Sequence, residues 1–430
     1  MKRVLRCVRC KKEYQLNKQG YTCECGGLLE VKIKERADLT HLKNTWRNRR
    51  LSNKAIDQSG VWRYKEFVFD FNEEEIVTFP EGNTNLYELP ENLLDVRKLF
   101  AKHEGENPTG SFKDRGMTVG ISFAKKLGYK TVMCASTGNT SSSMAAYASR
   151  AGLKSIVFIP EGKIAYGKLS QTLAYGAKTI QIKGDFDDAM KAARNIAQDY
   201  KIYLLNSINP IRLEGQKTIV LQLLDQLNWE VPDWIVLPGG NLGNTSAFGK
   251  VLKELKEFGF IEKAPCLAVI QAENANPFYR AFKTSFKEFA PVKAETVATA
   301  IRIGNPVNYE KALKSIQFTH GVVEEVSDRE ILLSKMEIDS LGIGCEPASA
   351  ASLAGAKKLR EKGIIKQEDT VVLILTGNIL KDPDTTINFH LGNIQGIPES
   401  LLNAPTLIKN RQDDIRKEIE RILEIGRAHV

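Results

Sequence analysis

The sequence predicts an α/β protein with parallel sheets, preceded by a small cysteine-bearing module. Short β-rich runs such as TVMCA at 131 and TVVLIL at 370 alternate with helical stretches over most of the chain. The 430 residues, 42% of them hydrophobic, are enough for two or three domains with large cores. Four of the seven cysteines lie within the first 25 residues. We therefore expect a multidomain body behind a separate N-terminal module.

The four early cysteines form two closely spaced pairs, Cys7 with Cys10 and Cys23 with Cys25. An odd cysteine total and the absence of an export signal argue against a disulfide framework. Two thiolate pairs can instead close a tetrahedral zinc site, and the glycines after Cys25 let the backbone turn beneath the sulfurs. We expect a structural zinc site in a ribbon-like module of residues 1–32. Reduced, unliganded thiols are the alternative, because C-x-C is less usual than C-x2-C.

The segments on either side of the predicted body differ from it in pattern. Residues 33–80 are charged and carry scattered tryptophan and tyrosine without a clean period, which favours an extension that wraps a larger body. Residues 396–430 have an amphipathic pattern and predict a helical tail. Between them, the predicted strands are TVMCA at 131, SIVFIP at 155, KTIQI at 178, DWIVL at 233, CLAVIQA at 266 and TVVLIL at 370.

Composition excludes some classes of protein and leaves others open. No uninterrupted apolar stretch approaches the ~18 residues that a membrane-spanning helix needs, and no apolar stretch follows the basic N-terminus as it would in a signal peptide. We therefore expect a cytoplasmic protein without a membrane partner. The formal net charge of +9 suits nucleic acid and anionic small molecules equally.

In an open parallel sheet, ligands bind beyond the carboxyl ends of the strands, so the turns after predicted strands are candidate sites. The turn PGGNLGNT at 238–245 follows the apolar run WIVL. Its glycines and asparagines can point successive N–H groups inward, and the next helix N-terminus would complete an anion nest. It has neither the GK[ST] ending of a triphosphate site nor the G-x-G-x-x-G fingerprint. A single phosphate monoester is favoured, and a plain turn is the alternative.

A second turn places a lysine where a helix is expected to begin. In NPTGSFKDRG at 107–116, Ser111 and Asp114 have the spacing of a capping box, which predicts Lys113 in the first helical turn. The positive end of a helix opposes the ammonium and lowers the lysine pKa, as a nucleophilic amine requires. A solvated surface lysine is the alternative.

Two further turns offer hydroxyl groups. The run ASTGNTSSS at 135–143 precedes a helical stretch, and its hydroxyls could serve a carboxylate or an aromatic hydroxyl. A solvated serine-rich loop is the alternative. In LTGNILKDP at 375–383, Thr376 follows a strand and could bond a ring nitrogen or merely cap its turn.

Together these residues resemble the threonine synthases, pyridoxal-phosphate (PLP) enzymes of fold type II, the tryptophan synthase β-like group. SFKDRGM and STGNT are shared with threonine dehydratases, whereas NSINPIRLEGQKT and TAIRIGNP are narrower. Two departures are Asn85, where proline is usual, and Asn378 with Ile379, where His-Gly is common. The motifs that carry the resemblance are EGNTNL (81–86), NPTGSFKDRGM (107–117), ASTGNTSSS (135–143), NSINPIRLEGQKT (206–218), TAIRIGNP (299–306), CEPASAAS (345–352) and LTGNILKDP (375–383).

The resemblance implies an architecture and a set of roles. A small domain of residues 106–207 would be inserted in a larger PLP domain of residues 81–105 and 208–395, with PLP between them, in a homodimer. Lys113 would hold PLP covalently, Asn139 would bond its 3'-hydroxyl, and Thr376 would face its ring nitrogen. The loop for the cofactor phosphate would comprise Gly240, Asn241, Leu242, Gly243 and Asn244. The substrate would be held at its carboxylate by Ser136, Thr137 and Thr140, and at its phosphate by Asn206, Ser207 and Arg212.

The activity that this resemblance implies is the conversion of O-phospho-L-homoserine and water to L-threonine and phosphate, a step of threonine biosynthesis. An alternative within PLP chemistry is β-elimination or β-replacement on phosphoserine, serine or threonine. An alternative of another class is a zinc-ribbon protein that binds nucleic acid. The spread of positive charge along the chain and the few aromatic residues among the basic residues of the module argue against it.

Overall fold

The computed structural model describes residues 2–34, 41–162, 166–184 and 186–427. The chain divides into two compact units, Met1–Pro383 and Asp384–Val430. Among the described residues, no helix is both long and apolar enough to cross a membrane. Short 3-10 helices accompany the larger elements: η1 (Trp62–Tyr64), η2 (Glu73–Glu75), η3 (Glu91–Leu93), η4 (Glu104–Glu106), η5 (Thr299–Ile301), η6 (Ile379–Lys381) and η7 (Glu399–Leu401).

The first unit begins with a three-stranded antiparallel sheet of order β2-β1-β3, which we call the ribbon (residues 2–33). Alternate residues of its last strand are buried, as expected of a strand with one face on a core. The sequence predicts such a module at the same place. Its strands are β1 (Arg3–Cys7), β2 (Glu13–Tyr14) and β3 (Leu29–Ile33).

The segment after the ribbon supplies aromatic side chains to the body. It forms α1 (Leu42–Arg50) and α2 (Ala55–Gln58). Trp46 of α1 is fully buried and stacks on Trp229 and Phe260, with ring centroids 5.8 and 5.5 Å away. The scattered aromatic residues of this segment therefore belong to a buried core.

A six-stranded sheet of order β12-β11-β10-β13-β5-β4 forms the larger core. All neighbours are parallel except β4 with β5. Ile235 and Leu237 of β10 face one core and Trp234 and Val236 face another, because successive strand residues point to opposite sides. The strands are β4 (Leu86–Leu89), β5 (Lys98–His103), β10 (Trp234–Pro238), β11 (Cys266–Ala272), β12 (Val322–Val326) and β13 (Thr370–Leu375).

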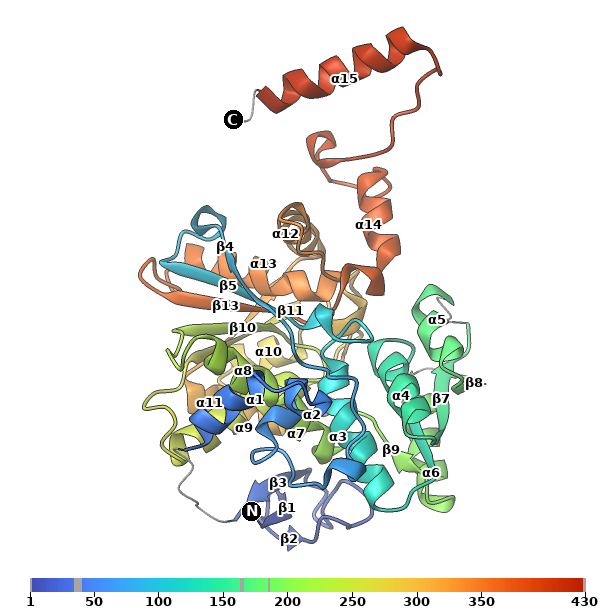
Figure 1. Cartoon of the computed structure of the whole chain (residues 1–430), viewed down its shortest axis with the longest axis vertical. Helices are drawn as coiled ribbons and strands as arrows, with labels where there is room; N and C mark the ends of the chain where they lie inside the picture. Colours follow the sequence, from blue (N-terminus) through green and yellow to red (C-terminus); the bar gives the residue numbers. More distant parts are fainter. Residues whose placement is uncertain (1, 35–40, 163–165, 185, 428–430) are drawn as a thin grey trace. The chain divides into compact units, whose positions relative to one another are not determined.

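Helices cover both faces of this sheet, as Figure 1 shows. On one face lie α8 (Thr218–Gln226), α9 (Gly243–Glu257), α10 (Pro277–Lys283) and α11 (Tyr309–Thr319). On the other lie α12 (Asp328–Ser340) and α13 (Pro347–Glu361).

A second sheet, of order β8-β7-β6-β9, is parallel throughout. It comprises β6 (Thr131–Ala135), β7 (Lys154–Pro160), β8 (Lys178–Ile182) and β9 (Tyr203–Leu204). The accompanying helices are α3 (Lys113–Lys126), α4 (Asn139–Arg150), α5 (Tyr166–Ala174), α6 (Phe186–Asp199) and α7 (Pro210–Gln216).

The predicted α/β class with parallel sheets is confirmed, and each of the six predicted strands is observed. The predicted helical tail is also present, as α15 (Gln412–Arg427), and it follows α14 (Pro383–His390). The boundaries between the predicted domains stay a prediction.

Candidate active site

Lys113 is the first residue of α3, as predicted. The turn before it is joined to the end of β13, because Phe112 donates its backbone N–H to the Thr376 carbonyl at 3.0 Å. The predicted capping box is wrong, because the N-cap residue is Phe112, which makes no side-chain cap, and the Ser111 hydroxyl accepts the Lys113 N–H at 3.4 Å rather than the Asp114 N–H. The Asp114 carboxylate instead accepts hydrogen bonds from the Thr109 hydroxyl at 2.6 Å and the Ser143 hydroxyl at 2.5 Å. Asp114 therefore connects the turn that precedes Lys113 to α4.

The surroundings of Lys113 favour the uncharged amine. Burial, and after it the positive charge of Arg212, lower its pKa from 10.5 to about 7, while Glu346 acts in the opposite direction. The amine lies 4.0 Å from the centre of the Phe112 ring. Only an uncharged amine can act as a nucleophile, so this position meets the chemical requirement that the sequence predicts.

Helices α3 and α7 pack closely enough to bring Arg212 against the lysine helix. A Cβ added to Gly120 of α3 would lie 3.2 Å from Cγ of Arg212, and one added to Gly215 of α7 would overlap the Arg115 carbonyl oxygen. Arg212 is 1% exposed, and its Nη1 donates to the Leu205 carbonyl at 2.7 Å. Its Nε has no hydrogen-bond partner among the described residues. A buried guanidinium with an unused donor is suited to an anion.

Asn206 and Ser207 follow β9, close to the start of the hydroxyl-rich turn. The Asn206 amide pairs with the backbone of Ala135 in both directions, donating to its carbonyl at 2.9 Å and accepting from its N–H at 3.0 Å. The Ser207 carbonyl accepts a hydrogen bond from the Asn308 amide at 3.1 Å. Asn206 thus holds the residue that precedes Ser136, and its role as a direct substrate ligand stays a prediction.

Ser136, Thr137 and Thr140 are partly exposed around the start of α4. The Ser136 hydroxyl accepts a hydrogen bond from the Gly138 N–H at 3.2 Å. The positive end of this 12-residue helix favours a negative charge at the same place. The arrangement suits the carboxylate that the resemblance assigns to these residues.

Glu346 is a site residue that sequence reasoning missed. Asn139 donates its amide N–H groups to both carboxylate oxygens at 3.1 and 3.2 Å, and the Thr376 hydroxyl donates to one of them at 3.5 Å. Burial raises the Glu346 pKa. Glu346 precedes Pro347, the first residue of α13, so its sequence position is typical of a helix start and gives no sign of this contact. The structure thereby joins the residues predicted to hold the 3'-hydroxyl and the ring nitrogen of PLP.

Lys381 is a second residue without a predicted role. Its ammonium donates to the Gln171 amide oxygen at 2.6 Å, the Ser142 hydroxyl at 3.1 Å and the Thr109 carbonyl at 3.2 Å. Burial lowers its pKa. A lysine just before Asp-Pro is typical of a solvated turn. Here its ammonium instead contacts Ser142 in the first turn of α4.

The predicted phosphate loop joins β10 to α9. Leu242 has a left-handed backbone, with φ of 59°, and a Cβ added to Gly240 would lie 3.2 Å from the Ala300 carbonyl oxygen. The Asn241 carbonyl accepts a hydrogen bond from the Asn308 amide at 3.2 Å. Within the described residues, the buried hydroxyl of Thr245 has no partner. A donor left free at a helix start fits a phosphate oxygen.

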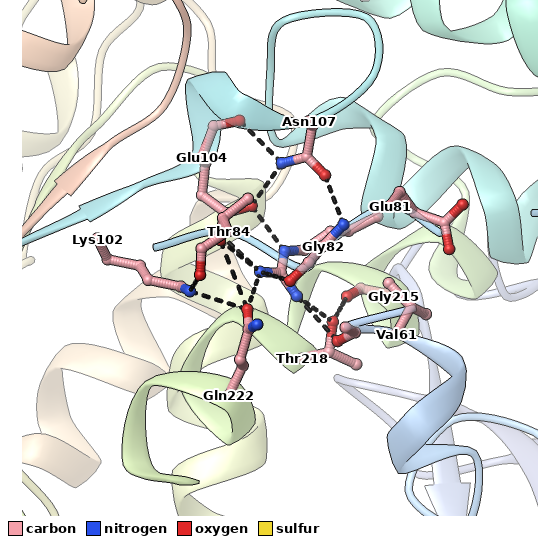
Figure 2. Close-up of polar contacts among 12 residues, drawn as sticks. Val61, Glu81, Gly82, Thr84, Lys102, Glu104, Asn107, Gly215, Thr218 and Gln222 are labelled. Carbon is pink, nitrogen blue, oxygen red and sulfur yellow. Dashed lines mark hydrogen bonds and ion pairs between the residues drawn. The ribbon is translucent and has the colours of Figure 1, made fainter. Parts of the chain in front are cut away.

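Arg115, two residues after Lys113, anchors the start of α3. Arg115 pairs with both carboxylate oxygens of Glu104 at 2.6 and 2.7 Å. Figure 2 shows the buried network of polar contacts to which Glu104 belongs. Arg115 also donates to the carbonyls of Gly60 and Gly82, each at 2.9 Å. One guanidinium thus ties the lysine helix to two segments that precede it in the chain.

The four predicted metal ligands lie together in the ribbon. The sulfurs of Cys7, Cys10, Cys23 and Cys25 are all within 4.8 Å of one another. Cys7 with Cys25 and Cys10 with Cys23 have sulfur–sulfur distances of 3.5 Å. Tetrahedral Zn–S bonds of about 2.3 Å require sulfurs about 3.8 Å apart. The cluster therefore fits one tetrahedral metal ion.

Comparisons with known proteins agree with this geometry. A family model described as pyridoxal-phosphate dependent enzyme matches residues 77–377. The chain is 50% identical over 377 residues to a threonine synthase of Methanocaldococcus jannaschii, covering 87% of this chain and 91% of the relative. It is 37% identical over 428 residues to chloroplastic threonine synthase 2 of Arabidopsis thaliana, covering 96% and 83%.

Solved structures show the same fold at lower identity. Maize serine racemase aligns with a TM-score of 0.59 at 21% identity, covering 72% of this chain and 93% of that one. The processed form of threonine deaminase isoform 2 from Solanum lycopersicum aligns with a TM-score of 0.59 at 20% identity, covering 70% and 82%.

Proposed function

The chain belongs to the threonine synthases, within the pyridoxal-phosphate dependent enzymes, and from this membership we propose that it converts O-phospho-L-homoserine and water to L-threonine and phosphate. It is accordingly a PLP-dependent lyase. The observation that carries the choice of substrate is Arg212, a buried cation with an unused donor whose charge lowers the pKa of Lys113. Because the charge of Arg212 acts on Lys113, a phosphate bound at Arg212 would lie in the electrostatic surroundings of the lysine.

The residues present fit PLP. Lys113 would supply the amine that binds it, and the loop from Gly240 to Asn244 with the Thr245 hydroxyl would receive its phosphate. Asn139 would bond its 3'-hydroxyl and Thr376 would face its ring nitrogen. When bound, PLP stabilises the electron pair that is left at Cα when a proton departs. A neutral hydroxyl at Thr376 does not force a proton onto the ring nitrogen as an aspartate would.

The chain's own residues bind the substrate at both ends and move its protons. The hydroxyls around the start of α4 receive the carboxylate, and Arg212 receives the phosphate. Lys113 removes the proton from Cα and then acts at Cβ, and its pKa of about 7 lets it accept and return protons near neutral pH. Phosphate departs from Cγ, and water adds at Cβ.

The test compares substrates on the PLP-loaded enzyme. Phosphohomoserine, phosphoserine and threonine are supplied side by side, and release of phosphate, L-threonine and ammonia is measured. We expect phosphohomoserine to be turned over fastest, with one threonine formed for each phosphate. The Lys113→Ala variant should release no phosphate above background. Faster turnover of phosphoserine, or phosphate release that survives Lys113→Ala, contradicts the proposal.

Three properties complete the proposal: a structural zinc ion on the four cysteines, a homodimer, and a cytoplasmic location. The sulfur cluster supports the first. The second is measured by light scattering, where a dimer has twice the chain mass of 48.0 kDa. A monomeric mass contradicts it.

A further inference from the structure

The ribbon contacts the chain segment that leads to the predicted phosphate ligands. The Tyr21 hydroxyl donates to the Leu204 carbonyl at 2.7 Å, and its ring packs edge-on against Tyr203 with centroids 6.2 Å apart. Leu204 ends β9 and lies two residues before Asn206. The ribbon thus reaches the strand end from which the phosphate segment, residues 205–212, departs.

A buried asparagine passes this contact on to α7. Asn209 donates to the Tyr21 hydroxyl at 3.1 Å and to the Leu204 carbonyl at 3.0 Å, and its amide oxygen accepts the Ile211 N–H at 2.9 Å as the cap of α7. Arg212 is the third residue of that helix and donates back to the Leu205 carbonyl. Hydrogen bonds therefore join the Tyr21 hydroxyl to the end of β9 and to the start of α7, at the two ends of the phosphate segment.

The position of Tyr21 depends on the cysteine cluster. Tyr21 lies two residues before Cys23, and its carbonyl accepts the Leu29 N–H at 3.1 Å. The Cys23 N–H donates to the Gly27 carbonyl at 2.8 Å. Modules below about 40 residues rarely hold their fold without a metal or disulfides, and the ribbon has its four cysteines free. We therefore expect a metal on the cysteines to stabilise the loop that carries Tyr21.

We propose that the ribbon is a metal-dependent support for substrate binding: with a metal on its cysteines, Tyr21 holds Leu204 and Asn209 and so positions Arg212 for the substrate phosphate. This inference rests on the proposed function, because it takes the phosphate of phosphohomoserine as the ligand of Arg212. Tyr21 is a positioning residue that touches neither substrate nor cofactor. Coupling is reciprocal, so phosphate at Arg212 must also strengthen metal binding.

The first experiment removes only the Tyr21 hydroxyl. In Tyr21→Phe the ring still packs on Tyr203, but the bonds to Leu204 and Asn209 are lost. We expect KM for phosphohomoserine to rise roughly threefold to tenfold, with kcat and the absorption spectrum of bound PLP unchanged. Lys32→Gln is the matched control, because it breaks another contact between ribbon and body, the 3.3 Å ion pair of Lys32 with Glu257 on α9. It should leave KM unchanged.

The second experiment measures zinc rather than activity. Transfer of zinc from the PLP-loaded enzyme to a coloured chelator is followed with and without inorganic phosphate. We expect phosphate to slow the transfer in the wild-type enzyme and in Lys32→Gln, and to have little effect in Tyr21→Phe, where the connection is cut.

The outcomes separate this inference from the proposed function. The support role is overturned by any one of four results: an unchanged KM in Tyr21→Phe, an equal rise of KM in Lys32→Gln, an altered absorption spectrum of PLP in Tyr21→Phe, or a rate of zinc transfer that does not depend on phosphate. In each case the turnover of phosphohomoserine by the wild-type enzyme, and with it the proposed function, stands. A wild-type enzyme that does not turn over phosphohomoserine overturns the proposed function, and the zinc measurement with inorganic phosphate still reports on the coupling.

Discussion

The pKa of Lys113 lies at about 7 chiefly because the amine is buried, and two charged residues act on it in opposite directions. Arg212 lowers its pKa and Glu346 raises it. Arg212 itself stays charged, since burial lowers its pKa only to about 10. At neutral pH the site therefore combines a permanent cation for the phosphate with an amine that exchanges protons readily.

This balance predicts the pH dependence of PLP binding to the cofactor-free protein. The rate should rise with pH as Lys113 loses its proton and become level above about pH 7, because the reactive amine is then uncharged. An ordinary lysine would give a rise that continues toward 10.5. The measurement is stopped-flow absorbance of PLP uptake at a series of pH values.

Two variants provide the controls, and they move the midpoint in opposite directions. Arg212→Gln removes a positive charge and should shift the midpoint upward. Glu346→Gln removes a negative charge and should shift it downward. A common shift in both variants, or no shift in either, would refute the electrostatic explanation.

Some site residues were open to prediction from the sequence and others were not. The four cysteines belong to a local pattern whose chemistry follows from spacing, whereas the spacing around Lys113 predicts only a helix start and its role comes from the resemblance. Glu346, Lys381 and Asn308 have their roles through contacts with residues far away in the chain, such as Glu346 with Asn139. No local pattern carries that information, since burial of a carboxylate beside an amide is decided by packing.

At the scale of elements, the close approach of α3 and α7 places Arg212 beside the lysine helix, and glycines make it possible. A Cβ at Gly215 would overlap the Arg115 backbone, one at Gly120 would lie 2.6 Å from a Leu205 methyl, and one at Gly116 would lie 3.1 Å from the Arg212 carbonyl. Backbone atoms cannot move away from an added Cβ as easily as the end of a flexible side chain can. The three sites therefore differ in how much strain an alanine causes.

We predict that alanine destabilises the protein most at Gly215, where it would overlap backbone, and less at Gly120 and Gly116. Overpacking of this kind costs about 1–3 kcal/mol in the free energy of unfolding. Urea denaturation followed by circular dichroism gives the order through the midpoints. Equal midpoints for the three variants would show that the helices are not in close contact.

The start of α3 illustrates where local sequence rules fail. The Ser111 and Asp114 spacing predicts a helix beginning at the correct place, but for the wrong reason. Asp114 bonds the Thr109 and Ser143 hydroxyls, and burial raises its pKa to about 6. Its partner Ser143 comes from α4, so tertiary contact replaces the local cap.

For the whole molecule, alternation of apolar runs with helical stretches predicts the parallel sheets because buried parallel strands have to be apolar throughout. Strands that break this pattern escape prediction. The edge strand β12 has the sequence VVEEV, and β9 has only two residues. In β5, Lys102 is fully buried and donates to the Thr84 carbonyl at 2.7 Å and to Gln222 at 2.8 Å, an arrangement that composition cannot reveal.

The most direct test of the proposed reaction follows the oxygen atom of water. With phosphohomoserine in water enriched in oxygen-18, the account predicts label in the hydroxyl group of L-threonine and none in the released phosphate, because phosphate leaves with its ester oxygen and water adds at Cβ. Mass spectrometry of both products decides the question. Label in the phosphate, with homoserine as the other product, would contradict the account.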